Sequence, residues 1–102
     1  MYDVVIIGAG PGGIFSAYEL IKHAPDLKIA VFESGNPLDK RICPIDGKKI
    51  KSCIKCKTCA IMNGFGGAGA FSDGKYNITN QFGGTLHHYI GEARATELMK
   101  YV

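Results

Sequence analysis

The sequence lacks a long hydrophobic run. None of its apolar segments approaches the roughly 20 residues that a transmembrane helix needs. The first three residues carry no basic cluster, and the short apolar stretch after them leads directly into glycines, unlike a secretory signal. We therefore expect a cytoplasmic protein with no membrane partner, whose cysteines are thiols or metal ligands rather than disulfides.

Acidic residues are scarce where basic ones gather. Seven of the twelve lysines and arginines lie between Lys40 and Lys57, and Asp46 is the one acid among them. The formal net charge of +3 indicates no particular partner by itself. At 102 residues and 46% hydrophobic, the chain is long enough for one small domain and too apolar for a disordered segment.

A buried-strand pattern leads into a glycine-rich turn near the start of the chain. Residues 4–7 (VVII) are typical of a strand buried on both faces of a parallel sheet. Gly8, Gly10 and Gly13 follow at the spacing G-x-G-x-x-G, and a helix is predicted from about Pro11 to Ala24. Such glycines allow a tight reversal, close approach of a pyrophosphate and close helix–strand packing, with the phosphate at the helix N-terminus.

An acidic residue closes a second strand pattern. Residues 27–32 (LKIAVF) predict a strand, and Glu33 follows it 20 positions after Gly13. A carboxylate at this place accepts hydrogen bonds from the hydroxyls of an adenosine ribose and repels a 2′-phosphate. The order of strand, glycines, helix, strand and acid predicts an α/β fold with a Rossmann-like βαβ dinucleotide-binding unit over residues 1–36.

Regular patterning stops after this unit. We expect an irregular, cysteine-containing basic insertion over residues 37–63 and a glycine-rich loop over residues 64–76, with a short edge strand near Ile78. Residues 84–102 are expected to be helical, with Thr85 capping the first of two helices. One crossover helix leaves a two-stranded sheet largely uncovered, and the last helix has no stop signal, so we expect an incomplete domain.

The insertion contains all four cysteines of the chain. Cys53, Cys56 and Cys59 form a C-x-x-C-x-x-C run, and Cys43 lies ten residues before it. One hypothesis is a four-cysteine metal site holding zinc or an iron–sulfur cluster, whose negative charge the surrounding lysines would offset. The other is a pair of redox thiols. We favour the metal site, and the spacing does not decide between zinc and iron–sulfur.

The glycine-rich loop (GFGGAGAFSDGK) has a backbone suited to wrapping a ligand closely and donating N–H groups to it. Ser72 and Lys75 add polar groups within reach of a phosphate or a ring oxygen. A flexible hinge is the alternative, but Phe65 and Phe71 are unlike a solvated linker.

Together these motifs resemble the N-terminal segment of FAD-dependent dehydrogenases, NAD(P)/FAD-dependent oxidoreductases of the glutathione-reductase-like (two-dinucleotide-binding) flavoprotein superfamily. The resemblance spans almost all 102 residues and rests on VVIIGAGPGGIFSAYEL, VFESGN, KRICP with the cysteine run and, most specifically, GFGGAGAFSDGKY. It implies bound FAD, and a small-molecule substrate or an electron donor such as NAD(P)H. Such proteins run to several hundred residues, so this chain is expected to be inactive by itself.

The resemblance also implies which residues hold the cofactor. The first loop would bind the FAD pyrophosphate, the acid after the second strand would bind the ribose, and an arginine with the second loop would approach the pyrophosphate, ribityl chain or flavin. These cofactor-binding residues are Gly8, Gly10, Pro11, Gly12, Gly13, Glu33, Ser34, Arg41, Gly66, Gly67, Ala68, Gly69, Phe71 and Ser72. No catalytic acid or base is identifiable.

Two alternative functions stay open. The insertion could be a zinc knuckle that binds nucleic acid or an acidic protein, although thiolate neutralisation already accounts for its basic residues and makes nucleic acid the weaker hypothesis. The βαβ unit could also bind NAD in place of FAD. The glycine-rich loop favours FAD, while the substrate and the oligomeric state are not specified by the sequence.

Overall fold

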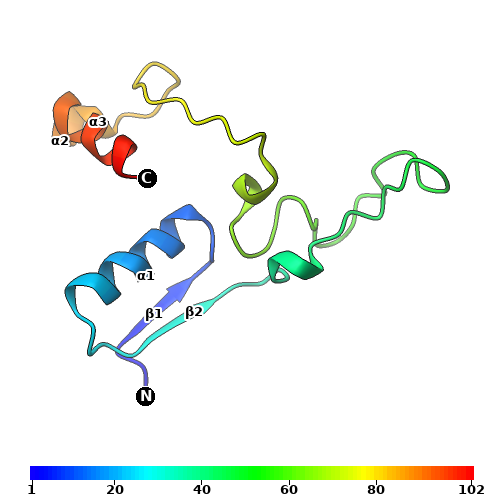
Figure 1. Cartoon of the computed structure of the whole chain (residues 1–102), viewed down its shortest axis with the longest axis horizontal. Coiled ribbons are helices and arrows are strands. Elements are labelled where there is room, and N and C mark those ends of the chain that lie inside the picture. The colour runs from blue at the N-terminus through cyan, green and yellow to red at the C-terminus, as the bar shows by residue number, and fades with distance from the viewer. The chain divides into compact units, whose positions relative to one another are not determined.

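The computed structural model describes all 102 residues, which form two compact units, Met1–Ser72 and Asp73–Val102. The first unit contains β1 (Val4–Ile7), α1 (Pro11–His23), β2 (Ile29–Phe32) and the short 3-10 turns η1 (Leu38–Lys40) and η2 (Ala68–Phe71), and the second contains α2 (Leu86–Ile90) and α3 (Glu92–Tyr101) (Figure 1).

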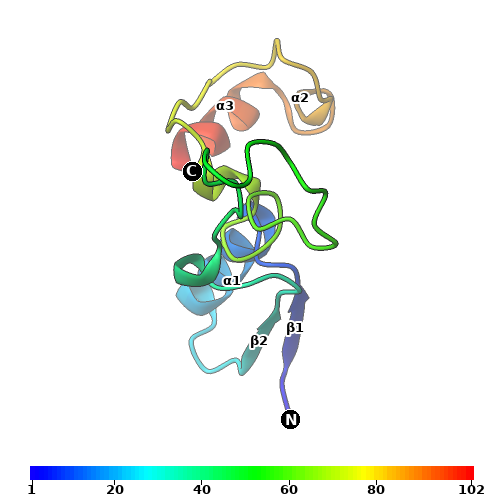
Figure 2. The same cartoon turned by 90° about the vertical axis from the view of Figure 1, so that its right-hand side faces the viewer.

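The first unit is built on a small α/β element. β1 and β2 pair in parallel, in register from Val4↔Ile29 to Ile7↔Phe32, and α1 crosses between them (Figure 2). Helix α1 begins at Pro11, where the missing N–H has no intrahelical partner, and ends with two basic residues in its last turn. The predicted strand–helix–strand order is confirmed, as expected for an incomplete Rossmann-like unit.

The sheet is largely uncovered, as expected for two strands and one crossover helix, so β1 lacks the burial on both faces that its apolar pattern is typical of. Val4 and Ile6 are half-buried, but Val5 is 53% and Ile7 is 81% exposed. Phe32, the partner of Ile7 in β2, is 56% exposed as well. The reason is that α1 alone packs on this sheet, so one face of the apolar strand pattern is covered and the other is not.

Residues 37–63 are irregular, as expected, apart from η1. A local turn orders the distal part of the insertion, because the Asp46 carboxylate accepts hydrogen bonds from the N–H groups of Lys48 (2.8 Å) and Ile50 (2.9 Å). These bonds lower the pKa of Asp46 below its usual value, and the bond from Ile50 has the largest effect. The cysteine-containing insertion is therefore held by turns and not by a hydrophobic core.

Two details downstream differ from the prediction. The glycine-rich loop contains the 3-10 turn η2, and the edge strand expected near Ile78 does not form. The two C-terminal helices occur where expected, separated by Gly91 at φ 83°, but the Thr85 side chain makes no capping hydrogen bond. Ala95 of α3 is the buried residue of this second unit. No helix has both the length and the apolar character needed to cross a membrane.

Candidate functional site

The turn between β1 and α1 combines a glycine at positive φ with an uncapped helix start. Gly8 has φ +98°, a conformation that L-residues with a side chain rarely adopt. Gly10 precedes α1 in an extended conformation (φ −77°, ψ −177°), and no side chain caps the helix and no acid lies in its first turn. The first N–H groups of α1 thus keep the partial positive charge that attracts an anion.

The glycines of this turn have different structural roles. A Cβ at Gly13 would lie 1.9 Å from the carbonyl oxygen of Gly8 and 3.3 Å from Ile6 Cγ2, so helix and strand can pack this closely only with glycine there. A Cβ at Gly10 or Gly12 would meet no atom within 4 Å. The fold therefore requires glycine at position 13, while at positions 10 and 12 it leaves open space for an approaching group.

Glu33 lies directly beside this turn. Its Oε2 accepts a hydrogen bond from the N–H of Ala9 (2.8 Å), and its Oε1 accepts one from the N–H of Gly35 (2.8 Å). These two hydrogen bonds, first that from Ala9 and then that from Gly35, lower the pKa of Glu33 below its ordinary value of 4.5. Glu33 is thus an anion at neutral pH, and its Oε2, which accepts one hydrogen bond, has a further lone pair for a ligand hydroxyl.

The second glycine-rich loop packs against the first. The N–H of Gly66 donates to the carbonyl of Ala9 (2.8 Å), across 57 positions of sequence. A Cβ at Gly67 would lie 3.3 Å from Gly10 Cα and 3.4 Å from Pro11 Cδ. The structure therefore brings Gly66 and Gly67 to the turn and helix start that the sequence assigned to the same cofactor.

The contact between the loops continues after β2. Gly35 and Gly64 pack backbone to backbone, since a Cβ at Gly35 would lie 2.5 Å from Gly64 Cα, and the N–H of Phe65 donates to the carbonyl of Asn36 (3.1 Å). Ala9, buried at 1% exposure, binds both Glu33 and Gly66 through its backbone. Ala9 and Asn36 were missed at the sequence level, because backbone groups leave no signature in residue type.

Arg41 is buried among backbone carbonyl groups. It is 3% exposed, and its guanidinium donates to four carbonyl oxygens: Ala60 (2.8 Å), Ile61 (2.6 Å), Phe65 (2.7 Å) and Gly67 (2.8 Å). It also lies 4.8 Å from the centre of the Phe71 ring. In this arrangement Arg41 serves as a clamp that holds the glycine-rich loop, and its expected approach to a cofactor stays a prediction.

The remaining predicted residues of the site are at its edge. Ser34 is exposed, with its hydroxyl 3.4 Å from Glu33 Oε1, and Ala68, Gly69, Phe71 and Ser72 lie in or directly after η2, all exposed. The structure thus groups the first loop, Glu33, Gly66 and Gly67 closely. It leaves the η2 residues on the surface.

The four cysteines are free thiols that line one cavity of about 80 Å³. Cys43 and Cys59 are half-buried, and Cys53 and Cys56 are exposed. The N–H groups of Met62 and Ile61, in that order, and the charge of Arg41 lower the pKa of the Cys59 thiol. No three cysteine, histidine or acidic side chains stand at positions from which they would already hold a metal ion.

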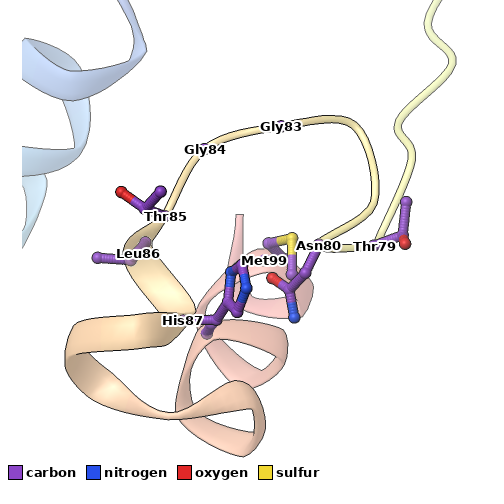
Figure 3. A pocket seen from close by; sticks show the side chains of 9 residues that line it. Thr79, Asn80, Gly83, Gly84, Thr85, Leu86, His87 and Met99 are labelled. Carbon is purple, nitrogen blue, oxygen red and sulfur yellow. The ribbon is translucent and has the colours of Figure 1, made fainter.

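The second unit has a larger cavity of its own, about 170 Å³, between the segment before α2 and helix α3 (Figure 3). Asn80, His87 and Met99 line it, and Figure 3 shows the His87 ring directed toward Met99 and Asn80. The His88 ring is in edge-to-face contact with His87, 4.2 Å between centres. No lysine, arginine or acidic side chain lines this cavity.

Comparisons with known proteins concern chiefly the βαβ unit. Residues 1–37 match the model of the Thi4 family. The thiamine thiazole synthase of Yarrowia lipolytica is 64% identical over 33 residues, and that of Candida albicans is 59% identical over 32 residues. These segments are 32% and 31% of this chain, and 10% and 9% of the relatives.

One similar protein extends beyond this unit. An uncharacterized protein of Clostridium beijerinckii is 41% identical over 71 residues, which is 70% of this chain and 13% of that protein. A match of this length leaves 31 of the 102 residues outside it, so it necessarily includes residues 32–71, with Glu33, the insertion and most of the glycine-rich loop. The chain spans about a tenth of the length of the relatives it matches. No solved structure matches it.

Proposed function

We propose that this chain is the nucleotide-binding, N-terminal part of a flavin-dependent oxidoreductase and that it holds the ADP portion of FAD. The diphosphate would lie at the start of α1, over the open positions Gly10 and Gly12, with the ribose hydroxyls on Glu33. Bound flavin supplies the redox chemistry. The protein's residues supply binding and orientation, and the rest of the site would come from sequence outside these 102 residues.

The observation that carries this proposal is the convergence of two glycine-rich loops and one carboxylate on the uncapped end of α1. Gly66 binds Ala9, and Gly67 packs on Gly10, so both loops border the same anion-attracting N–H groups. Glu33 is held there by two backbone hydrogen bonds. A structural βαβ turn without a ligand would require neither the open glycines nor the second loop.

The similar proteins support the coarse part of the proposal. The Thi4 family match covers the βαβ unit and one further residue, and the matches to thiamine thiazole synthases span 33 and 32 residues, so they favour a nucleotide site. They carry no argument for thiazole synthesis by this chain. The assignment to dehydrogenase chemistry rests instead on the resemblance of the glycine-rich loop to that of FAD-dependent dehydrogenases.

Adenosine recognition by Glu33 provides the test. The full-length product of the gene is titrated with ADP-ribose and with its 2′-phosphate derivative, and binding is measured calorimetrically. We expect the 2′-phosphate to weaken binding, because it meets the Glu33 carboxylate. Glu33→Gln should weaken ADP-ribose binding about tenfold, the loss typical of a charged hydrogen bond, and should reduce the discrimination against the 2′-phosphate.

Glu19→Gln is the matched control. Glu19 is a carboxylate of the same unit, but it lies on α1 and pairs with Lys22 (3.8 Å) and His23 (3.1 Å) within the helix. This variant should bind both ligands as the unaltered protein does. If Glu33→Gln and Glu19→Gln behave alike, Glu33 does not bind the ribose and the proposed orientation of the nucleotide is wrong.

A further inference from the structure

The base of the insertion brings all four cysteines of the chain to one cavity. Cys43 lines it from the first segment of the insertion, and Cys53, Cys56 and Cys59 line it from the segment that follows the Asp46 turn. The rest of the lining is largely apolar, contributed mainly by proline, isoleucine and alanine side chains. Four soft sulfur ligands around a small apolar cavity are the ligand set that zinc and iron–sulfur centres use.

The backbone after Cys53 turns so that an N–H group faces its sulfur. Lys55 adopts φ 54°, in the left-handed region, and its N–H donates to Cys53 Sγ at 3.4 Å. Outer-shell hydrogen bonds of this kind orient thiolate ligands and stabilise their charge at metal centres.

The surrounding charge suits a metal–thiolate centre. Four thiolates around one divalent cation carry a net charge of about −2. The segment from Lys40 to Lys57 has seven basic residues against the single acid Asp46, and Asp46 is engaged in its own turn. This excess of positive charge sits on the same segment as the thiols and would otherwise repel itself.

The cysteines also frame the Arg41 clamp. Arg41 lies two residues before Cys43, and its guanidinium binds the carbonyls of Ala60 and Ile61, the two residues that follow Cys59. The same guanidinium binds Phe65 and Gly67 of the glycine-rich loop. A link between Cys43 and Cys59 would therefore close the insertion directly beside the clamp.

We propose that Cys43, Cys53, Cys56 and Cys59 hold a four-thiolate metal centre, zinc or an iron–sulfur cluster, which closes the insertion at its base and fixes the backbone that Arg41 clamps. Metal binding would draw the four sulfurs into coordination within the cavity they already share, with release of the thiol protons. The centre is structural and independent of the nucleotide site, so it does not rest on the proposed flavin function.

The test measures metal on the protein as its own gene encodes it, purified without oxygen and with no nucleotide added. We expect about one zinc per chain, or iron with sulfide and the broad visible absorption of a cluster. After removal of the metal by a chelator, titration with Co²⁺ should give the intense visible bands of tetrahedral thiolate coordination. Metal should also slow tryptic cleavage after Lys55 and Lys57, both within the closed run.

Cys56→Ser replaces one ligand in an exposed position, where the fold has little to lose, and should weaken Co²⁺ binding at least tenfold and change its spectrum. Thr58→Ser is the matched control, because it introduces serine two residues further on without removing a sulfur or a charge, and it should bind Co²⁺ normally. The proposal is overturned if the anaerobic protein carries no metal and binds no Co²⁺, if Cys56→Ser binds as Thr58→Ser does, or if thiol titration shows a Cys53–Cys56 redox pair. None of these outcomes depends on nucleotide binding.

Discussion

Two neighbouring glycines allow ligand binding to be separated from folding. Gly10 and Gly13 belong to the same G-x-G-x-x-G turn, and a family motif gives both the same weight. In the structure, an alanine methyl group at position 10 meets no atom within 4 Å, whereas one at position 13 lies 1.9 Å from the Gly8 carbonyl oxygen. The two Gly→Ala substitutions should therefore have different effects.

Gly10→Ala should leave stability nearly unchanged. The backbone at Gly10, φ −77° and ψ −177°, is accessible to alanine, so the change in unfolding free energy should stay within about 0.5 kcal/mol, or be favourable by up to about 1 kcal/mol through the unfolded state. Binding should change much more. If the methyl group keeps a diphosphate from one charge-assisted N–H contact, the loss is about 1.5–3 kcal/mol, or roughly tenfold to a hundredfold in affinity.

Gly13→Ala should act on the fold itself. The added methyl group must displace the Gly8 carbonyl or push α1 from β1, and overpacking of this kind costs about 1–3 kcal/mol or more. Urea denaturation of both variants gives the stability changes, and calorimetric titration with ADP gives the affinities. The reasoning is refuted if Gly10→Ala binds ADP as tightly as the unaltered protein, or if Gly10→Ala destabilises the protein as much as Gly13→Ala.

The other predictions concern the carboxylate, the clamp and the chain by itself. The pKa of Glu33 is lowered in the folded state, so the ionised carboxylate stabilises the fold above pH 4.5, and this contribution is lost as the pH falls through the folded pKa. Glu33→Gln should therefore reduce the loss of unfolding free energy at acid pH. An unchanged dependence of stability on pH would contradict the assignment. Arg41→Met should lower the unfolding free energy, measured by urea denaturation, by about 3 kcal/mol or more, because four carbonyls lose their donor. Arg41→Lys should recover only part of this loss, since one ammonium group cannot reach all four acceptors. The 102-residue chain alone should bind FAD weakly or not at all and show no reductase turnover, so a yellow, active preparation of it would be inconsistent with an incomplete domain.

The local elements were predictable because local sequence determines them. The β-branched run of residues 4–7, Pro11 at the helix start and the basic residues at its end each act on their own segment, and β1 and α1 occur within about a residue of the expected bounds. The need for glycine at position 13 was also predictable, since helix and strand are adjacent in the chain. The apolar pattern of β1 did not by itself show the exposed face. That face followed from the presence of a single crossover helix, because burial depends on which other elements cover the sheet.

The arrangement of the site was only partly predictable. The sequence identified both glycine-rich loops and Glu33, but not the Gly66–Ala9 hydrogen bond between segments 57 positions apart. The sequence also did not show that Arg41 binds four backbone carbonyls, because every residue possesses such a group. Side-chain chemistry indicates which groups can bind a ligand, and only the tertiary structure shows which of them are already engaged.

The most direct measurement of the central claim is the absorption spectrum of the protein as its own gene encodes it, followed by denaturation and identification of the released nucleotide. If the open turn at Gly10 and the carboxylate of Glu33 hold the ADP portion of a flavin, the spectrum will show flavin bands and the released compound will be FAD, in an amount that falls in Gly10→Ala protein. Release of a nicotinamide dinucleotide, or a colourless protein that binds no added FAD, would contradict the account.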